Sequence, residues 1–154
     1  TGLLDYARVR TPDRQPASLV ELVERVLGSD WIPSEVRVER AFEPVPLLDI
    51  DADQLHGAVF NLVRNAVEAM GDGGTLRVEI RVDGEHVLLV VADSGPGISA
   101  HVRPHLFEPL HSTKPLGVGL GLVTARTFVE AHGGRIRLAD SPIGARFEIR
   151  LPVG

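Results

Sequence analysis

The residues best suited to chemistry are an aspartate and two glycines in "DSGPGI", residues 93–98, directly after the apolar run "HVLLVVA". An ionised carboxylate accepts hydrogen bonds and donates none, so Asp93 at the end of a buried strand needs a donor partner. The amino group of an adenine would be such a donor, and Gly95 and Gly97 leave room for a flat ring against the backbone. The same residue types also build common type I and type II turns, so this stretch alone leaves both interpretations open.

A second candidate is "GVGLGL", residues 117–122, at the predicted start of a helix. A glycine at the start of a helix lowers the stability of the helix by roughly 1 kcal/mol relative to alanine. Three glycines within five residues therefore suggest a functional reason for their presence. Helix N-termini expose unpaired N–H groups that bind anions, and bare glycines let phosphate oxygens reach them. A flexible turn is the alternative. Neither a Rossmann fingerprint nor a P-loop fits, because no strand precedes the stretch and no Gly-Lys-Ser/Thr follows it.

The third candidate is "NLVRNAVEAM", in which Asn61 and Asn65 lie one helical turn apart on the same face. An amide oxygen is a neutral, hard ligand that suits a Mg²⁺ ion arriving with phosphates and keeping several waters. The alternative is a polar stripe that faces solvent.

Patterns of apolar residues, caps and turns predict the elements that hold these residues. Ser18, with Glu21 as its capping-box partner, caps a first helix, and Asp51 or Asp53 caps a second, largely buried one. Tight turns join residues 75–82 to 86–93 and residues 135–140 to 145–152, so each of these two pairs of strands is predicted to form a hairpin. "TPDRQPA", residues 11–17, is predicted to be a linker because its prolines oppose helix and sheet. The predicted helices cover 19–28, 52–70 and 120–132, and the predicted strands cover 35–42, 75–82, 86–93, 135–140 and 145–152. Residues 44–50 are expected to be a proline-bounded extended stretch, and a long loop covers 94–118.

Composition indicates one domain with a core of its own. The chain has 154 residues, of which 44% are hydrophobic, and no apolar run approaches the ~20 residues of a membrane span. The net charge of −5 argues against a nucleic-acid binder. The absence of cysteine fits a reducing cytoplasm. The elements predict an α+β sandwich, one sheet covered on one face by helices.

The order of the motifs is more specific than any one of them. Asn-x-x-x-Asn on a helix, Asp-x-Gly-x-Gly after a strand, Phe107-Glu108-Pro109, and Gly-x-Gly-x-Gly opening a helix resemble the ATP-binding domain of sensor histidine kinases. In that family they are the N box, first glycine box, F box and second glycine box. The resemblance covers residues 16–154 and implies the Bergerat fold: a two-layer α/β sandwich with a mixed sheet, about three helices on one face, and a mobile ATP lid.

The resemblance also implies roles for individual residues. Asp93 would hold the adenine amino group, Asn65 would coordinate Mg²⁺, and Asn61 would lie beside the phosphates. Lys114 would reach the phosphates from the lid, so Asn61, Asn65 and Lys114 are the expected catalytic residues. The remaining expected ATP-binding residues are Gly95, Gly97, Ile98, Phe107, Gly117, Gly119, Leu120 and Gly121.

The sequence departs from related families at three points. Gyrase- and MutL-type ATPases have a glutamate base where Asn61 stands, and asparagine cannot take a proton from water. Ala145 stands where many relatives have a threonine beside adenine. None of the six histidines has the His-Glu-x-x-Asn/Thr-Pro context of a phosphoacceptor; we expect His56 to pack within the apolar arc of its helix and His132 to be favoured by a helix dipole. The six histidines of the chain are His56, His86, His101, His105, His111 and His132.

The expected function is therefore to bind Mg-ATP and donate its γ-phosphate to a histidine on another domain. "LLDYAR" resembles the end of the family's dimerisation and phosphoacceptor helix, so we expect residues 1–15 to be that end plus a linker and 16–154 to be the catalytic domain. The expected partners are that phosphoacceptor domain, in a homodimer, and a response regulator, with no nucleic-acid or membrane contact. A free-standing serine kinase of the anti-sigma type is the main alternative, although "LLDYAR" argues against it; a binding module without ATP is another. Residues 99–116 are expected to be poorly ordered without nucleotide, with Phe107 as an anchor.

Overall fold

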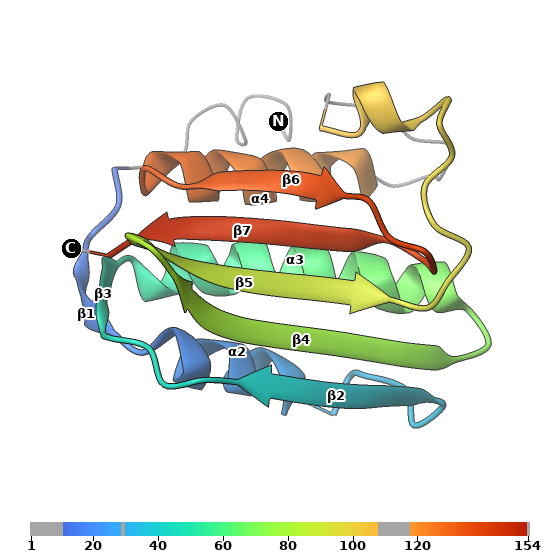
Figure 1. Cartoon of the computed structure of the whole chain (residues 1–154), viewed down its shortest axis with the longest axis horizontal. Coiled ribbons are helices and arrows are strands. Elements are labelled where there is room, and N and C mark those ends of the chain that lie inside the picture. Colours follow the sequence, from blue (N-terminus) through green and yellow to red (C-terminus); the bar gives the residue numbers. More distant parts are fainter. Residues whose placement is uncertain (1–10, 29, 108–117, 154) are drawn as a thin grey trace.

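The computed structural model describes residues 11–28, 30–107 and 118–153. Within them, one face of a five-stranded sheet is covered by the helices α2 (Leu19–Leu27), α3 (Ala52–Met70) and α4 (Val118–Ala131) (Figure 1). The predicted α+β sandwich, with helices on one side only, is confirmed. No helix in this described part combines the length and apolar character needed to cross a membrane.

The sheet is mixed, with the strand order β2-β4-β5-β7-β6. Only the pair β2 and β4 is parallel, and each other neighbouring pair is antiparallel. The last strand of the chain therefore lies inside the sheet. The strands are β2 (Val36–Phe42), β4 (Gly74–Asp83), β5 (His86–Asp93), β6 (Arg135–Ala139) and β7 (Arg146–Pro152).

A separate two-stranded ribbon corrects one prediction. The stretch expected to be a linker contains β1 (Gln15–Ala17), which pairs antiparallel with β3 (Leu48–Ile50). Proline lacks the N–H that an inner strand must donate, but an edge position tolerates it. Pro16 stands opposite Asp49 in this two-strand ribbon, where every strand is an edge. The stretch around Pro16 thus contains a strand, although its prolines predicted neither helix nor sheet.

Side-chain caps fix the helix starts as predicted. The Ser18 hydroxyl accepts a hydrogen bond from the Glu21 N–H (3.1 Å), and the Asp51 carboxylate accepts one from the Gln54 N–H (3.2 Å). Between the two candidate caps for α3, the structure selects Asp51. A helix stopped at Gly71 and a strand starting at Gly74 then lead back into the sheet.

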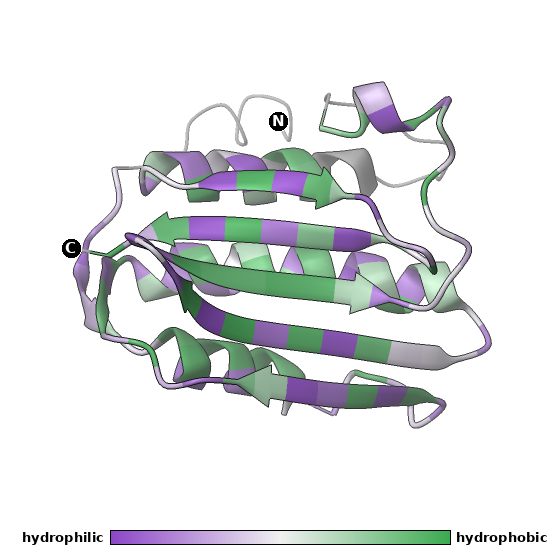
Figure 2. Cartoon of the chain, viewed as in Figure 1, coloured by the Kyte–Doolittle hydropathy of each residue, from purple (hydrophilic) through white to green (hydrophobic). Residues whose placement is uncertain are grey.

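Strand β5 explains why the central run of the chain is so apolar. Figure 2 shows hydrophobic and hydrophilic residues alternating along β4 and β7, whereas β5 is hydrophobic along most of its length. Its Val87, Leu89 and Val91 join the core under the helices. Leu88 and Val90 point to the opposite face, yet only 1% and 0% of their surfaces are exposed. Something other than a helix must therefore cover them.

That cover is a network of ion pairs. Glu148 on β7 stands directly opposite Val90 and accepts from Arg137 (2.9 Å) and Arg146 (3.0 Å). Arginine stems are apolar and can lie along such a surface while their charged ends stay solvated. Burial alone would raise the pKa of Glu148, but the hydrogen bonds and positive charges of Arg146 and Arg137 lower it. The open face of the sheet thus carries ion pairs beside two buried apolar side chains.

Candidate functional site

Asp93 is the last residue of β5 and its side chain is 7% exposed. Its Oδ1 atom accepts hydrogen bonds from the backbone N–H groups of Gly95 (2.9 Å) and Ala145 (3.4 Å). Both bonds fall on one oxygen. Among the described residues, Oδ2 has no hydrogen-bond partner. The carboxylate is therefore fixed in position by backbone groups and keeps one oxygen for another donor.

Burial sets the electrostatics of this carboxylate. Desolvation raises the pKa of Asp93, and the hydrogen bonds from Gly95 and Ala145 lower it by less, so the net direction is upward. An ionised carboxylate in such a place gains more from a new donor than an exposed one would. The group is held ready to accept a hydrogen bond from a ligand.

Glycines bring three chain segments together around Asp93. A Cβ on Gly95 would lie 3.0 Å from Asp93 Oδ1 and 3.1 Å from the Ala69 carbonyl oxygen of α3. Gly97, at φ +81°, would meet the Gly144 carbonyl oxygen at 3.1 Å. The bareness of this stretch therefore serves close approach between backbone segments of the chain itself, and the room that it was expected to leave for a flat ring stays a prediction.

Gly144 is a site residue that the sequence analysis missed. It adopts φ +64°, and a Cβ there would overlap the backbone carbonyl oxygen of Asp93. In the sequence it belongs to "SPIG", a pattern that indicates only a hairpin turn. A turn glycine gives no sign of what it packs against, since Asp93 lies far away along the chain.

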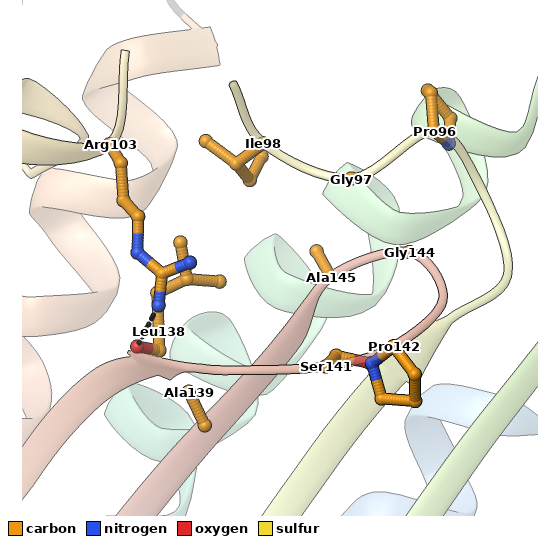
Figure 3. A pocket seen from close by; sticks show the side chains of 10 residues that line it. All are labelled: Pro96, Gly97, Ile98, Arg103, Leu138, Ala139, Ser141, Pro142, Gly144 and Ala145. Atoms are coloured by element: carbon orange, nitrogen blue, oxygen red, sulfur yellow. Dashed lines mark hydrogen bonds between the residues drawn. The ribbon is translucent and has the colours of Figure 1, made fainter. Parts of the chain in front are cut away.

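A cavity of about 200 Å³ opens beside these residues. Figure 3 shows it between Gly97 and Ile98 on one side and Ala145 on the other, with the Arg103 guanidinium bonded to the Leu138 carbonyl (3.2 Å). Ligand pockets commonly measure about 300–1,000 Å³, so the described residues enclose only part of a typical one. Asp93 does not line this cavity but contacts two residues that do, Gly144 and Ala145.

Asn61 and Asn65 lie on α3, one turn apart and half-buried, as predicted. Neither side chain has a hydrogen-bond partner among the described residues. The position of a Cβ on Gly121 of α4 would be 3.8 Å from Asn61 Oδ1. The structure thus brings the asparagine motif against the second glycine motif, although about sixty residues separate them. Within the described part of the chain, two amide side chains remain available there for a ligand or metal ion.

The segment after Ile98 is anchored at three points. Phe107 contacts Phe147 of β7 edge-on, with ring centroids 6.2 Å apart, as its predicted role as an anchor requires. Leu106, which the sequence analysis did not single out, is 7% exposed and joins the core. A salt bridge from Arg103 to Asp140 (3.0 Å) also ties this segment to the turn after β6.

Some predicted site residues are not described in full. Lys114 and Gly117 lie within residues 108–117, outside the described part of the chain. Gly119 and Leu120 belong to the first turn of α4. Their predicted contacts remain predictions, and so does the expected order of the lid.

The structure corrects the interpretation of His132. It follows the last residue of α4, as expected, but it is only 2% exposed, and its Nε2 atom accepts a hydrogen bond from the Asp51 N–H (2.9 Å). A backbone N–H can only donate, so Nε2 carries no proton and the ring is not the cation that a helix dipole would favour. His56 is half-buried on α3.

A fixed carboxylate at a strand end, glycines at close approach and two amides on a neighbouring helix form a candidate small-molecule site at one end of an α/β sandwich. Known proteins resemble the chain in sequence and in fold. The family described as histidine kinase-, DNA gyrase B-, and HSP90-like ATPases matches residues 50–154. The sensory histidine kinase/phosphatase NtrB of Escherichia coli O157:H7 is 36% identical over 154 residues, which cover 91% of this chain and 44% of NtrB. The chain therefore spans less than half of that relative's length.

Solved structures agree with the sequence comparison. A mycobacterial sensor histidine kinase, MprB, is 32% identical, with a TM-score of 0.78 over 90% of this chain and 97% of that one. Full-length ShkA in complex with AMPPNP is 26% identical, with a TM-score of 0.83 over 98% of this chain and 34% of that one. The chain belongs to the histidine kinase-, DNA gyrase B- and HSP90-like ATPase family, and within it to the sensor histidine kinases.

Proposed function

We propose that this chain is the catalytic domain of a sensor histidine kinase, which binds Mg-ATP and donates the γ-phosphate to a histidine of a dimerisation and phosphoacceptor domain. The observation that carries the proposal is the buried Asp93 carboxylate, held through Oδ1 and with Oδ2 open to a new donor. An adenine presents an amino group of the required kind, whereas a guanine presents an oxygen at the corresponding position. The ATP analogue bound to ShkA supports the same ligand class.

Gly97 and Ile98 would contribute to the nucleotide pocket, since both line the cavity next to Ala145, Ile98 with an apolar side chain. Gly95 would keep the backbone close to the Asp93 carboxylate. At the other side of the site, the N–H groups in the first turn of α4 and the partial positive charge of that helix end suit phosphate oxygens. Lys114 would supply a positive charge to the same oxygens, and Gly117 would line the triphosphate.

The two amides of α3 suit a magnesium ion bound through phosphates. Asn65 offers a neutral amide oxygen to which no described residue donates a hydrogen bond. One protein ligand is enough for a magnesium ion that is also bound by waters and phosphate oxygens. When bound, the ion neutralises charge that develops on the transferred group. Asn61, beside Gly121, would orient the phosphates. It has no basic group to activate water, so the site favours transfer over hydrolysis.

The acceptor would be supplied by another domain. We infer that residues 1–15 are the end of its second helix and the linker, that the whole protein is a homodimer, and that a response regulator receives the phosphate. Because ATP is a cytoplasmic metabolite, the proposal places the domain in the cytoplasm. The similarity to sensor kinases such as NtrB favours this function over an anti-sigma serine kinase.

A reconstituted transfer tests the proposal. The chain is incubated with radiolabelled ATP, Mg²⁺ and a separately produced dimerisation and phosphoacceptor domain from the same gene. Label should appear on the acceptor, and it should be labile to acid and stable to base, as phosphohistidine is. Base-labile, acid-stable label on a serine-containing partner would instead support the anti-sigma alternative, and no transfer to any acceptor would contradict both.

A further inference from the structure

His132 holds two hydrogen bonds that fix its ring completely. Its Nε2 atom accepts from the Asp51 N–H (2.9 Å), so the proton lies on Nδ1, which donates to the Phe128 carbonyl (2.8 Å). The bond to Phe128 stays at the C-terminal end of α4, because Phe128 precedes His132 by four residues. The first bond crosses to the N-cap of α3. One buried ring therefore joins the C-terminal end of α4 to the N-terminal end of α3.

The two helices touch along their length in an antiparallel arrangement. One to two turns further into the helix pair from the Asp51–His132 bond, the Phe128 ring of α4 packs against Gly57 of α3. A Cβ on Gly57 would lie 3.3 Å from that ring. At the far end, Gly121 faces Asn61. Eleven residues separate His132 from Gly121, or about 16 Å of helix at 1.5 Å per residue. The contact at one end of the pair thus sets how the glycine-rich turn meets Asn61 at the other.

The same junction holds the segment that enters the domain. The Asp13 N–H donates to Asp51 Oδ2 (3.0 Å), and the Arg14 guanidinium donates to the Ala131 carbonyl (3.0 Å). Pairing of β1 with β3 continues this attachment up to Ile50, which precedes Asp51. The entering segment therefore contacts both helices at their joined ends, while β5, whose last residue is Asp93, finishes at the opposite end of the sheet (Figure 1).

We propose that His132 is a positioning residue for phosphoryl transfer: through the Asp51 N–H it holds α4 in register with α3, and so aligns the glycine-rich first turn of α4 with the triphosphate. The proposal rests on the proposed function, in which that turn contacts phosphates. It leaves adenine recognition aside, since Asp93 is fixed by Gly95 and Ala145 and not by α4. The hydrogen bond from the Asp51 N–H to His132 Nε2, here called the register bond, should therefore affect binding of the phosphates and not binding of the adenine base.

Two substitutions separate the two bonds of the ring. In His132→Asn, the side-chain N–H₂ replaces the Nδ1–H and can still reach Phe128, but the amide oxygen is too close to the backbone to take the place of Nε2 as acceptor for the Asp51 N–H. In His132→Gln, the longer side chain places its carbonyl oxygen near the former Nε2 and restores that acceptor. His86→Asn, at the start of β5 and away from both helices, is the matched control.

Calorimetry compares a non-hydrolysable ATP analogue with adenosine on each variant. His132→Asn should raise the dissociation constant of the analogue about tenfold, because a misaligned first turn of α4 loses about one hydrogen bond to a charged phosphate. The dissociation constant of adenosine should change by less than about twofold. His132→Gln and His86→Asn should leave both constants within about twofold. Phosphoryl transfer to the supplied acceptor should fall with His132→Asn and recover with His132→Gln.

Several results would overturn the proposal. If His132→Asn weakens analogue and adenosine alike, the residue only supports the fold; if it weakens neither, the register bond is unimportant. If His132→Asn does not fold, a loss of analogue binding by a folded His132→Gln would be equally decisive against it. Failure of the unmodified chain to bind the analogue would instead refute the proposed function, so the two failures are distinguishable.

Discussion

The backbone carbonyl oxygen of Asp93 occupies the space that a side chain on Gly144 would need. Gly144→Ala should therefore lower the free energy of unfolding by about 3 kcal/mol or more, because steric overlap adds to left-handed backbone strain. Gly84→Ala is a close control, since Gly84 has nearly the same φ (+63°) and nothing within 4 Å of the added carbon. It should cost about 1–2 kcal/mol. Equal losses in urea denaturation would show that the overlap is relieved without cost.

The open oxygen of Asp93 predicts base selectivity. Asp93→Asn should weaken ATP binding by at least about 1 kcal/mol, because the amide is a poorer acceptor than the carboxylate. The unmodified chain should bind ATP in preference to GTP. Asp72→Asn, the same chemical change on an exposed residue, is the control. Calorimetry that finds equal affinities for ATP and GTP would rule out the adenine assignment.

The raised pKa of Asp93 also predicts a gain in stability from that same substitution. Because the folded-state pKa lies above the unfolded one, folded protein holds the proton more tightly, and stability falls as the pH rises through the folded pKa. An asparagine side chain at this position would keep an oxygen for the two backbone donors without the buried charge. Asp93→Asn should therefore melt at a higher temperature than the unmodified chain at pH 7. That difference should shrink as the pH is lowered through the pKa of Asp93, and a constant difference would contradict the argument.

The position of Asn65 predicts loss of transfer with an intact fold. Asn65→Ala should abolish phosphoryl transfer to the supplied acceptor domain, and its melting temperature should stay the same or rise slightly, since alanine is the better helix former. Glu68→Ala is a control on the next turn, because its ion pair with Arg64 (3.3 Å) is exposed and contributes little. Transfer by Asn65→Ala at the unmodified rate would reduce Asn65 to a surface residue.

The isolated chain should bind ATP and neither label itself nor turn ATP over at an appreciable rate. No histidine has an acceptor context, and Asn61 provides no general base, a role typically worth about 10²–10⁴ in rate. Asn61→Glu should raise ATP hydrolysis modestly, because the surrounding groups are not arranged to hold a water. Acid-labile label on the chain alone, after incubation with radiolabelled ATP and Mg²⁺, would mean that one of its own histidines is an acceptor.

Local patterns predict most of the fold. Ser18 and Asp51 cap helices because their side chains act within three residues, and the β4–β5 hairpin follows from the alternation along β4, the apolar run of β5 and one tight turn. The linker predicted around Pro16 is wrong, because its strand exists only through pairing with β3, more than thirty residues later. Local composition cannot report a partner at that distance.

The site was predictable where its residues sit in motifs and unpredictable where they act across the sheet. Asp93, Asn61 and Asn65 stand in recognisable spacing, and each lies on the helix or strand predicted for it. Gly144 and the Ala145 N–H hold Asp93 from about fifty residues away. His132 likewise acquires its acceptor role only because α4 ends beside the N-cap of α3. Such contacts follow from the folded arrangement and leave no local pattern.

The place of β7 between β5 and β6 has a consequence for synthesis on the ribosome. Until residues 144–152 have left the exit tunnel, β6 has no neighbour in the sheet and β5 has an open edge. Asp93, made some fifty residues earlier, then lacks the Ala145 N–H that fixes it. A nascent chain should therefore become competent to hold nucleotide in one late step, and a stalled chain ending before Gly144 should expose a hydrophobic strand edge to chaperones.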